Sequence, residues 1–555
     1  MTQMTQEKKK SVRNGIFRLA AAILAVIVDF ALIAVLLTQL ADYAEWVNLA
    51  IRLLGSVLVL GIYSQYKTAS MKVPWIVLIL SMPFTGVLLY LLVGLSGSTR
   101  KMRRRYEAID RLLLPYLPEN REILEKAAVE APETAGTMRY IADRAPYPPY
   151  ADTDVTYFPD AAEGLASQLR DMEKAEHFIF MEYFAIEDQE AWHSVQTVLE
   201  ERVKAGVEVR VFYDDMGSIS FIDSDFVKRM EAIGIHCRAF NPVSFIFRLF
   251  VNHRDHRKLT VIDGKVGYTG GYNMANEYFN ITHPYGMWKD TGIRMEGGAV
   301  RSLTIMFLEM WNAVRDRDAD DRDFRKYLPP LKTVPSGPDA SEPIASGPNA
   351  SDPDAVPPAE AGSDAAEADP AFPKGVVQPY ADSPMDNEHV GEDVYISMVQ
   401  SASRYCYFTT PYLIITDEMS HTIGLAAKRG VDVRIITPGI PDKKLIYGVS
   451  RSFYNRLARN GVRIYEWTPG FIHSKMCIAD GRAAVIGTIN LDYRSLYHHF
   501  EDACQLYNCE AVRDIKEDFD RLFPECREVT EEYAGGRKTY MRLGQLFLRF
   551  FAELL

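Results

Sequence analysis

Three long apolar stretches dominate the pattern of the first 105 residues: Leu19–Leu40, Trp46–Tyr63 and Val73–Val93. The first is long enough to cross a bilayer core and carries Asp29 as its only charge. Polar residues interrupt the second, whereas the third has no charge and its prolines are tolerated in membrane helices. A cleaved signal peptide would have a shorter apolar run with no further apolar segments behind it. The pattern therefore predicts two or three transmembrane helices.

Beyond this head, short apolar strands alternate with helical stretches, and the same succession occurs twice. Two of the three matches consist of a helix end, a glycine and a strand. The matching pairs are 205–215 with 429–439, 231–242 with 458–469, and 256–273 with 473–490. Such alternation predicts βαβ units in a mostly parallel sheet with helices on both faces. The duplication predicts two halves related by a pseudo-twofold axis.

An acidic segment separates the two copies. Residues 333–373 contain eight acidic residues, no basic residue and nine of the chain's 29 prolines. This composition buries too little apolar surface to offset the entropy of ordering, so a disordered linker is expected, with a partner-binding role as the alternative. The predicted organisation has four parts: a membrane anchor (1–105), a first half (106–332), the linker (333–373) and a second half (374–555).

Charge is distributed unevenly along the chain, whose net charge is -12. The head has 13 basic and four acidic residues, while the rest is acidic, which argues against a nucleic-acid partner but not against anionic lipid beside the bilayer. Basic clusters at the N-terminus, at Lys67 and Lys72, and at 100–105 all favour the cytoplasmic side. Three full spans cannot place both the basic N-terminus and the cluster at 100–105 on the cytoplasmic side. We expect a multi-pass protein of a bacterial plasma membrane with a cytoplasm-facing body, and six scattered cysteines are compatible with a reducing compartment.

Each half contains the motif H-x-K-x-x-x-x-D followed by a glycine-rich turn and an asparagine. In a strand, residues i and i+2 point to the same face, so each histidine and lysine project side by side. An imidazole beside an ammonium suits phosphate chemistry, while the aspartate lies near a D-G turn and is better placed to support the site. The candidate catalytic residues are His256, Lys258, Asp263, His473, Lys475 and Asp480. The asparagines after the turns, Asn273 and Asn490, are candidate phosphate donors.

Two alternatives concern these histidines. A single H-x-K in a strand is usually a surface pair, but two copies at equivalent positions of a repeat favour a catalytic pair. Metal binding by His253 and His256 is disfavoured because Arg254 and Lys258 repel cations, and the pair 498–499 offers no chelating frame. We therefore expect no metal and no cofactor.

The chain resembles the phospholipase D superfamily, and more closely the bacterial cardiolipin synthases. The paired motifs carry the resemblance to the superfamily, and further segments match the synthase version: 252–264, 269–278, 288–290, 487–495, 500–502 and the membrane segment 74–94. Two departures stand out. Thr488 replaces the commoner serine, and Asp502 stands where many members have leucine.

The resemblance implies an α/β fold of two phospholipase D-like α/β/α halves behind a transmembrane region. It implies that one histidine attacks phosphorus to form a phosphatidyl-histidine while the other protonates the leaving glycerol. Near-symmetry gives only a weak preference for His256 as nucleophile and His473 as acid. By the same resemblance, Lys258, Lys475 and the two asparagines stabilise the phosphoryl oxygens. Three acids are expected to orient the histidines or line the substrate site: Glu277, Asp290 and Glu501.

The implied reaction joins two phosphatidylglycerols into cardiolipin and glycerol, with other anionic phospholipids and the membrane as partners. A membrane-bound phospholipase D that forms phosphatidic acid would use the same residues. A nuclease would need a basic surface, and a non-catalytic lipid-binding protein would be expected to have lost one motif. Whether phosphatidylethanolamine is also a donor, and the oligomeric state, stay open. The apolar segments 245–251 and 539–555 are candidate lipid contacts, with packing on the core as the alternative.

Overall fold

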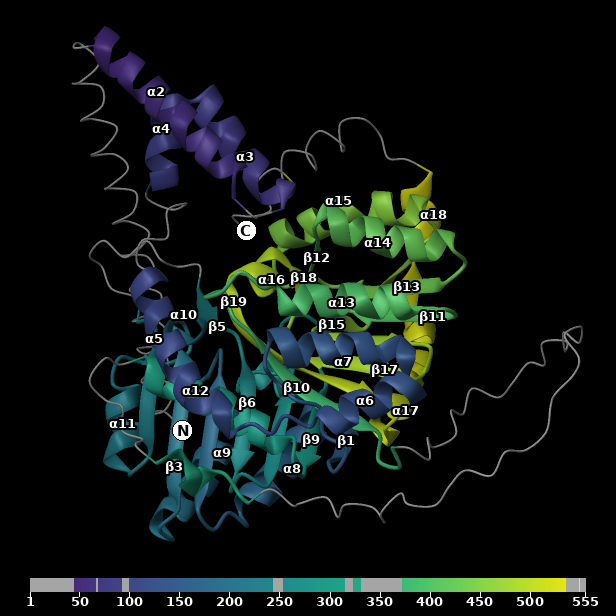
Figure 1. The fold of residues 1–555 in the computed structure, drawn as a ribbon. Helices are drawn as coiled ribbons and strands as arrows, with labels where there is room; N and C mark the ends of the chain where they lie inside the picture. The colour runs from purple at the N-terminus through teal and green to yellow at the C-terminus, as the bar shows by residue number, and fades with distance from the viewer. Residues whose placement is uncertain are drawn as a thin grey trace, which may run out of the picture.

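The computed structural model describes residues 44–65, 68–91, 99–242, 253–314, 323–330 and 372–535, together with Arg549. Two mixed β-sheets lie side by side in its body, with helices around them (Figure 1). Four predictions fall wholly or almost wholly outside the described residues: the first apolar stretch, the acidic linker, the apolar segment 245–251 and the C-terminal tail.

The first sheet has seven strands in the order β1-β9-β7-β6-β2-β3-β4. Its strands are β1 (Asp154–Phe158), β2 (Phe178–Tyr183), β3 (Glu208–Asp214), β4 (His236–Phe240), β6 (Lys258–Ile262), β7 (Val266–Gly270) and β9 (Gly292–Glu296). Only β2, β3 and β4 run parallel to one another, and every other neighbouring pair is antiparallel. The expectation of a mostly parallel sheet was therefore wrong. The motif strand β6 returns directly as β7 through Asp263 and Gly264, whose φ angles of 53° and 64° suit a two-residue hairpin turn.

The second sheet repeats this order as β10-β19-β17-β16-β11-β13-β14, and β20 is added at its edge. Its strands are β10 (Val376–Asp382), β11 (Tyr405–Thr409), β13 (Asp432–Pro438), β14 (Arg463–Trp467), β16 (Met476–Ala479), β17 (Ala483–Gly487), β19 (His499–Tyr507) and β20 (Cys526–Glu528). The second motif strand, β16, occupies the place of β6 and again pairs with β11 and β17 in antiparallel fashion. The internal repeat thus corresponds to two sheets of the same topology.

Helices cover the sheets and join them. The outer face of the first sheet packs on α8 (Ala161–Met172), α9 (Glu190–Lys204) and α11 (Phe226–Ala232). The second half carries α13 (Val390–Ser401), α14 (Asp417–Lys428) and α15 (Lys444–Arg459). Between the halves lie α12 (Val300–Ala313), which contacts β6 and β10, and α17 (Glu510–Leu522), which contacts β1 and β16. Because both helices touch both sheets, one apolar cluster extends through the two halves.

Three helices precede β1. They are α5 (Thr99–Leu113), α6 (Arg121–Glu130) and α7 (Pro132–Arg144). Helix α5 packs on α12, where Tyr106 donates to Met310 Sδ at 3.2 Å. Helix α7 instead packs on α13 of the second half, and Tyr140 donates to Asp393 at 2.7 Å. The expected first half, 106–332, therefore includes a helical segment that belongs by contact to the other half.

The N-terminal helices are α2 (Ala44–Tyr63), α3 (Ala69–Ser81) and α4 (Pro83–Leu89). In the described part of the chain, none of the helices has the length and apolarity needed to cross a bilayer. The single span expected over 73–93 is divided at Met82, since Pro83 begins a new helix. Gly86 lets α4 lie directly on α3, where a Cβ would come within 2.6 Å of Ile79 Cα.

Short elements complete the fold and bring loops together around the motifs. They are α10 (Asp215–Ser218), α16 (Tyr493–Tyr497), α18 (Thr530–Ala534), β5 (Arg254–Asp255), β8 (Met287–Lys289), β12 (Leu413–Ile414), β15 (Gly470–Ile472), β18 (Leu491–Asp492) and the 3₁₀ turns η3 (Leu114–Tyr116), η4 (Asn276–Phe279), η5 (Phe324–Tyr327) and η6 (Phe523–Glu525).

Candidate active site

Two short strand pairs connect the halves at the motifs. Strand β5 of the first half pairs with β19 of the second, and β15 of the second half pairs with β8 of the first. The backbone N–H of His256 donates to the Phe500 carbonyl at 2.8 Å, and that of His473 donates to the Lys289 carbonyl at 2.7 Å. Each motif histidine is therefore held at the seam by backbone of the other half.

The seam also gives each histidine a carboxylate from the opposite half. His256 Nδ1 lies 2.9 Å from both carboxylate oxygens of Glu501, and His473 Nδ1 lies 2.7 Å from Asp290 Oδ2. Both carboxylates are fully or almost fully buried. A carboxylate accepts a proton donated by Nδ1, so this arrangement selects the tautomer in which Nε2 carries a lone pair. The two crossed pairs occupy the Nδ1 atoms with carboxylates, so the Nε2 atoms face away from Glu501 and Asp290.

The two departures from the synthase pattern have partners at this seam. The Thr488 hydroxyl donates to Glu501 Oε2 at 2.5 Å. Asp502 accepts from the Lys258 backbone N–H at 3.2 Å and from the Thr269 hydroxyl at 2.5 Å. Burial raises the pKa of Asp502 to about 6. Thr488 thus holds the Glu501 carboxylate, and Asp502 holds the start of the motif strand β6. Sequence spacing did not predict these contacts.

The motif lysines lie beside their histidines as the i, i+2 spacing predicts. Lys258 Nζ donates to the His256 carbonyl at 2.5 Å, and Lys475 Nζ lies 2.7 Å from His473 Nδ1 and 3.1 Å from Nε2. Burial lowers the pKa of Lys258 to about 8 and that of Lys475 to about 7, although nearby carboxylates oppose the fall. An anionic substrate would therefore shift both lysines toward the charged ammonium form.

Burial and neighbouring cations also favour neutral imidazoles. The pKa of His256 falls well below 6.5, chiefly through burial and then through the charges of Lys258 and Lys475. The pKa of His473 falls to about 4 by burial and Lys475, but the carboxylate of Asp290 opposes this fall. Because charges of the second motif affect a histidine of the first, the two motifs meet in one site.

Aromatic side chains wall both imidazoles. The ring of Phe184 packs edge-on against His256 with centroids 4.9 Å apart. Tyr278 and Trp288 each lie 5.3 Å from the His473 ring, and Phe471 lies 5.9 Å from it. These walls restrict the histidine rotamers and keep water from the buried face, which strengthens charge interactions in the site.

The motif aspartates hold loops and do not contact the reacting groups. Asp263 accepts the backbone N–H groups of residues 176–178 at 2.8–2.9 Å. Asp480 accepts those of residues 403–405 at 2.7–2.8 Å and also the Ser403 hydroxyl. Each aspartate therefore fixes the start of the strand beside its motif strand. These contacts agree with the supporting position that the D-G turns indicate for Asp263 and Asp480.

The remaining predicted residues differ in their surroundings. Each polar atom of the Asn273 amide has a protein partner. Oδ1 accepts from the Ala185 backbone N–H at 3.1 Å, and Nδ2 donates to the Tyr278 hydroxyl at 2.8 Å. Asn490 Oδ1 is buried and makes no hydrogen bond to the described residues. Burial, Glu187 and Asp442 raise the pKa of Glu277 to about 7. Among the described residues Glu277 makes no hydrogen bond to either histidine, so the orienting role expected for it belongs to Asp290 and Glu501.

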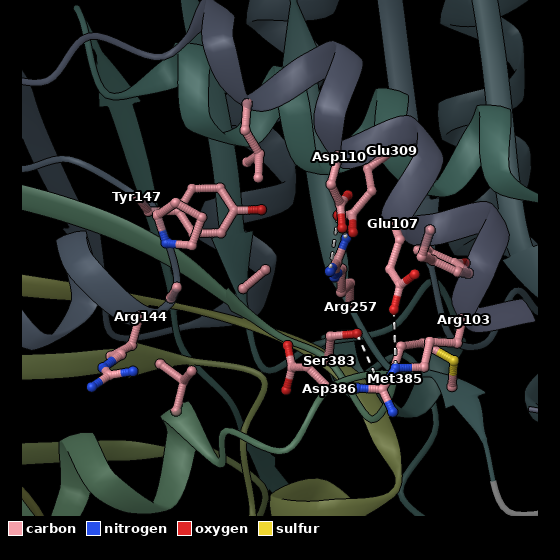
Figure 2. Close-up of a pocket in the computed structure, with 16 residues that line it drawn as sticks. Arg103, Glu107, Asp110, Arg144, Tyr147, Arg257, Glu309, Ser383, Met385 and Asp386 are labelled. Carbon is pink, nitrogen blue, oxygen red and sulfur yellow. Dashed lines mark hydrogen bonds and ion pairs between the residues drawn. The ribbon is translucent and has the colours of Figure 1, made fainter. Parts of the chain in front are cut away.

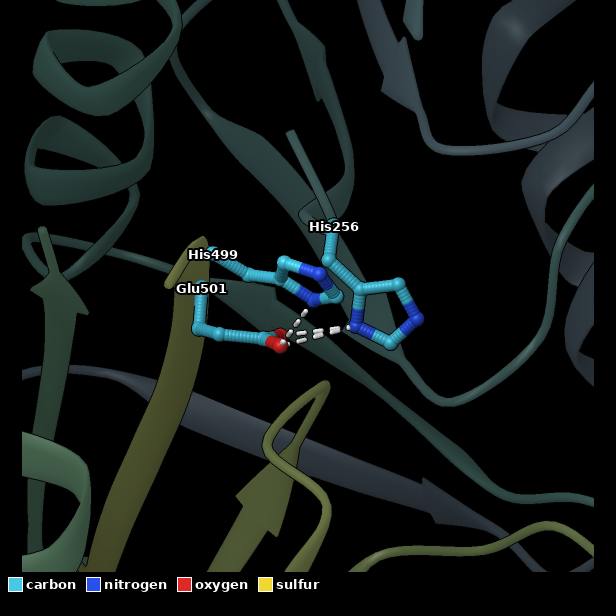
Figure 3. A group of neighbouring side chains, drawn as sticks. All are labelled: His256, His499 and Glu501. Atoms are coloured by element: carbon cyan, nitrogen blue, oxygen red, sulfur yellow. Dashed lines mark hydrogen bonds and ion pairs between the residues drawn. The ribbon is translucent and has the colours of Figure 1, made fainter. Parts of the chain in front are cut away.

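A third histidine joins the first pair. His499 Nδ1 lies 3.6 Å from Glu501 Oε1, and its ring centroid is 5.4 Å from that of His256 (Figure 3). One donor atom from each of the three residues can be chosen so that all lie within 4.8 Å of one another, a grouping able to hold a metal ion. The prediction that 498–499 offers no chelating frame is corrected, because His256 of the other half and Glu501 complete the frame.

A cavity of about 110 Å³ lies behind the motif strand and is distinct from the histidine site. Arg257, which lies between β5 and β6, points into it (Figure 2). Its guanidinium donates to Glu309 Oε2 at 3.3 Å and to the Glu501 carbonyl at 3.3 Å. Beside this pair, burial and Glu309 raise the pKa of Asp110 to about 9. The fully buried arginine thus braces Glu501 from the far side.

Known proteins resemble this chain along most of its length. The family described as "Cardiolipin synthase, PLD-like domain" matches residues 395–523, and that described as "Phospholipase_D-nuclease N-terminal" matches 52–94. A cardiolipin synthase of Geobacillus thermodenitrificans is 30% identical over 83% of this chain and 85% of its own length. One of Geobacillus kaustophilus is 28% identical over 88% and 90%. An uncharacterised protein of Streptococcus mutans is 38% identical over 91% of this chain and 100% of its own.

A solved structure shares the fold. The phosphatidylserine synthase of Haemophilus influenzae is 15% identical and superposes with a TM-score of 0.52 over 75% of this chain and 97% of its own. Three findings point to the same family: the likeness in fold, the identity to curated synthases over more than four-fifths of the chain, and the paired motifs at one seam. The chain belongs to the cardiolipin synthase family of the phospholipase D superfamily and is a phosphatidyltransferase of that type.

Proposed function

We propose that this enzyme makes cardiolipin and glycerol from two molecules of phosphatidylglycerol through a phosphohistidine intermediate. The observation that carries the proposal is the crossed pairing of His256 with Glu501 and His473 with Asp290. Two imidazoles held at Nδ1 by carboxylates and flanked by two lysines provide a nucleophile, an acid and a positive pocket for one phosphodiester. Exchange of one phosphodiester for another is nearly balanced in energy, so the chemistry needs no nucleotide.

In the first step, His256 Nε2 attacks phosphorus of the donor lipid. A P–N bond forms while the P–O bond to the headgroup glycerol breaks, and His473 Nε2 delivers a proton to the departing oxygen. The ammonium groups of Lys258 and Lys475 offset the charge on the equatorial oxygens. The amide of Asn490, whose Oδ1 has no described partner, is available to orient with the bound phosphate.

In the second step, the terminal hydroxyl of an acceptor phosphatidylglycerol takes the place of the departed glycerol. His473 Nε2, now neutral, removes the hydroxyl proton as the oxygen attacks phosphorus and the P–N bond breaks. His256 regains its lone pair, and His473 ends the cycle with the proton it began with. Water in place of the acceptor would give phosphatidic acid, so exclusion of water by the aromatic walls favours transfer.

The electrostatics favour this division of roles. Burial favours neutral imidazoles before substrate binds, and the Asp290 carboxylate opposes the fall in the pKa of His473. The pKa of Asp290 is itself lowered by Lys475 and His473 against the effect of burial, so this partner stays anionic at neutral pH. An incoming phosphate adds a further negative charge and raises the proton affinity of His473. We therefore assign His473 as the acid and His256 as the nucleophile.

We also propose that the N-terminal head anchors the body to the bacterial plasma membrane as a multi-pass segment, with the body facing the cytoplasm. Large apolar side chains are exposed on α2 and α3, including Trp46, Leu53, Leu60 and Leu80. Exposed apolar faces of this extent are typical of membrane or protein contacts. Helix α5 follows them with a run of arginines, which favours anionic headgroups.

The test is incubation of the purified full chain with labelled phosphatidylglycerol, with and without phosphatidylethanolamine. We expect cardiolipin and glycerol in equal amounts, and none from His256→Ala or His473→Ala, although both variants still insert into membranes. Phosphatidic acid as the sole lipid product would instead establish hydrolysis. Near-normal synthesis by either variant would refute the two-histidine scheme.

A further inference from the structure

The catalytic scheme leaves one buried histidine of the seam without a task. His499 is 9% exposed at the start of β19, and neither of its ring nitrogens has a hydrogen-bond partner among the described residues. A buried polar group without a partner is costly, so such atoms point to an additional ligand or an internal water. The nearest polar group is the Glu501 carboxylate, at 3.6 Å from Nδ1.

We propose that His256, His499 and Glu501 form an inhibitory binding site for a borderline transition-metal cation such as Zn²⁺. The three side chains come from both halves, point toward one another and are buried (Figure 3). Two imidazoles and one carboxylate are a donor set that zinc accepts, with a fourth position left for water or a phosphate oxygen.

The spacing of the donor atoms fits four-coordinate geometry. Bonds of about 2.0–2.1 Å at tetrahedral angles place neighbouring donor atoms about 3.3 Å apart. The separations present are 2.9 Å from His256 Nδ1 to Glu501 and 3.6 Å from His499 Nδ1 to Glu501. All three donor atoms lie within 4.8 Å of one another, so rotation of the side chains toward a common centre admits the ion.

Coordination at this site would inactivate the enzyme through the tautomer of His256. At present Nδ1 carries the proton and donates it to Glu501, which leaves the lone pair on Nε2. A metal bound to Nδ1 takes that nitrogen's lone pair and displaces the proton to Nε2. An Nε2 that carries a proton has no lone pair with which to attack phosphorus. The nucleophile assignment rests on the proposed function, whereas metal binding itself does not.

The charges around the site indicate a regulator and not a resident cofactor. The ammonium groups of Lys258 and Lys475 lie beside the motif histidines and oppose any added cation. The buried carboxylates of Glu501 and the neighbouring Asp502 favour it. We therefore expect reversible binding that chelators remove, with anionic substrate and metal competing for the space in front of His256.

Binding is tested by titrating the full-length detergent-solubilised chain with Co²⁺, whose visible d–d bands report tetrahedral nitrogen and oxygen ligands, and by displacing it with Zn²⁺. We expect one such site per chain in the wild type and in His473→Asn, which keeps all three ligands but is catalytically inactive. His499→Asn should weaken Co²⁺ binding at least about tenfold. The matched control is His498→Asn, which removes the adjacent histidine and should bind Co²⁺ as the wild type does. Absence of the bands in the wild type, or unchanged binding by His499→Asn, would overturn the site.

Inhibition is tested separately with the same proteins. Zn²⁺ should inhibit the wild type and EDTA should restore its activity, while His499→Asn should keep most metal-free activity and resist Zn²⁺. His499→Gln, with melting temperatures recorded for both variants, guards against a folding defect. Equal inhibition of the wild type and a folded His499 variant would refute the inhibitory role. Failure to make cardiolipin would bear on the proposed function alone, because the Co²⁺ bands are measured without turnover.

Discussion

The substitution Asp290→Asn tests which histidine is the acid. The carboxylate lies 2.7 Å from His473 Nδ1 and is 1% exposed, so its charge acts on the imidazolium through little solvent. At about 4 Å between charge centres and an effective dielectric constant of about 20, that attraction is worth about 4 kcal/mol. The amide keeps the shape but loses the charge. We expect cardiolipin synthesis to fall about 10²–10³-fold, since each 1.4 kcal/mol is a factor of ten.

A leaving group that needs no proton makes the test specific. With phosphatidyl-p-nitrophenol as donor, departure of p-nitrophenolate does not depend on an acid, so the first burst of coloured product should fall no more than about tenfold in Asp290→Asn. Stopped-flow absorbance measures that burst before acceptor attack. Glu501→Gln is the matched control, because Glu501 is the partner of the other histidine, His256. It should lose the first step with phosphatidyl-p-nitrophenol as well as with phosphatidylglycerol, because it disturbs the nucleophile. Equal losses with both donors for Asp290→Asn, or rescue of Glu501→Gln, would refute the role assignment.

Three further outcomes follow from the site. Phosphate binding should weaken as pH rises through about 7 to 8, because the lowered pKa values of Lys475 and Lys258 mean that their charge is present below this range and lost above it. Since the reaction also needs one protonated imidazole, kcat/KM should be bell-shaped in pH. A flat profile between about pH 5 and 9 would contradict this. Asp480→Asn should lower the free energy of unfolding by about 1–3 kcal/mol, seen in chemical denaturation, while activity per folded molecule stays within about twofold. Gly271→Ala should lower activity at least as much as Asp290→Asn does, since the new Cβ would lie 2.0 Å from Asp290 Oδ1. Retained activity in a folded variant would show that this carboxylate is free to move.

Much of the site was accessible from residue patterns because it depends on local geometry. The i, i+2 spacing predicts that His256 and Lys258 lie side by side, and the structure places them so just before and at the start of β6; the duplicate at His473 indicates the second copy. The D-G pairs at 263–264 and 480–481 encode hairpin turns through two consecutive positive φ angles. The same turns explain why the sheet is mixed, a feature that the alternation of strands and helices concealed.

Other features depend on which distant segments meet. The sequence gives no indication that Glu501 serves the histidine of the other half, because the pairing of β5 with β19 joins residues nearly 250 positions apart. His499 lies beside His256 through the same strand pair, which is why the sequence alone predicted no chelating frame at 498–499. Helix α7 packs on α13 of the second half although its residues precede β1, a contact that the repeat does not indicate.

The sequence by itself determined the chemistry of this protein: two copies of a histidine–lysine strand, each closed by its own turn, in a chain with an apolar head. Those properties depend on residues within a few positions of one another, where backbone periodicity dictates direction. Only the tertiary structure decided how the copies cooperate. Crossed strand pairs at the seam give each imidazole a carboxylate from the other half, and such long-range pairing is selected by packing of both sheets around shared helices, which no local pattern encodes.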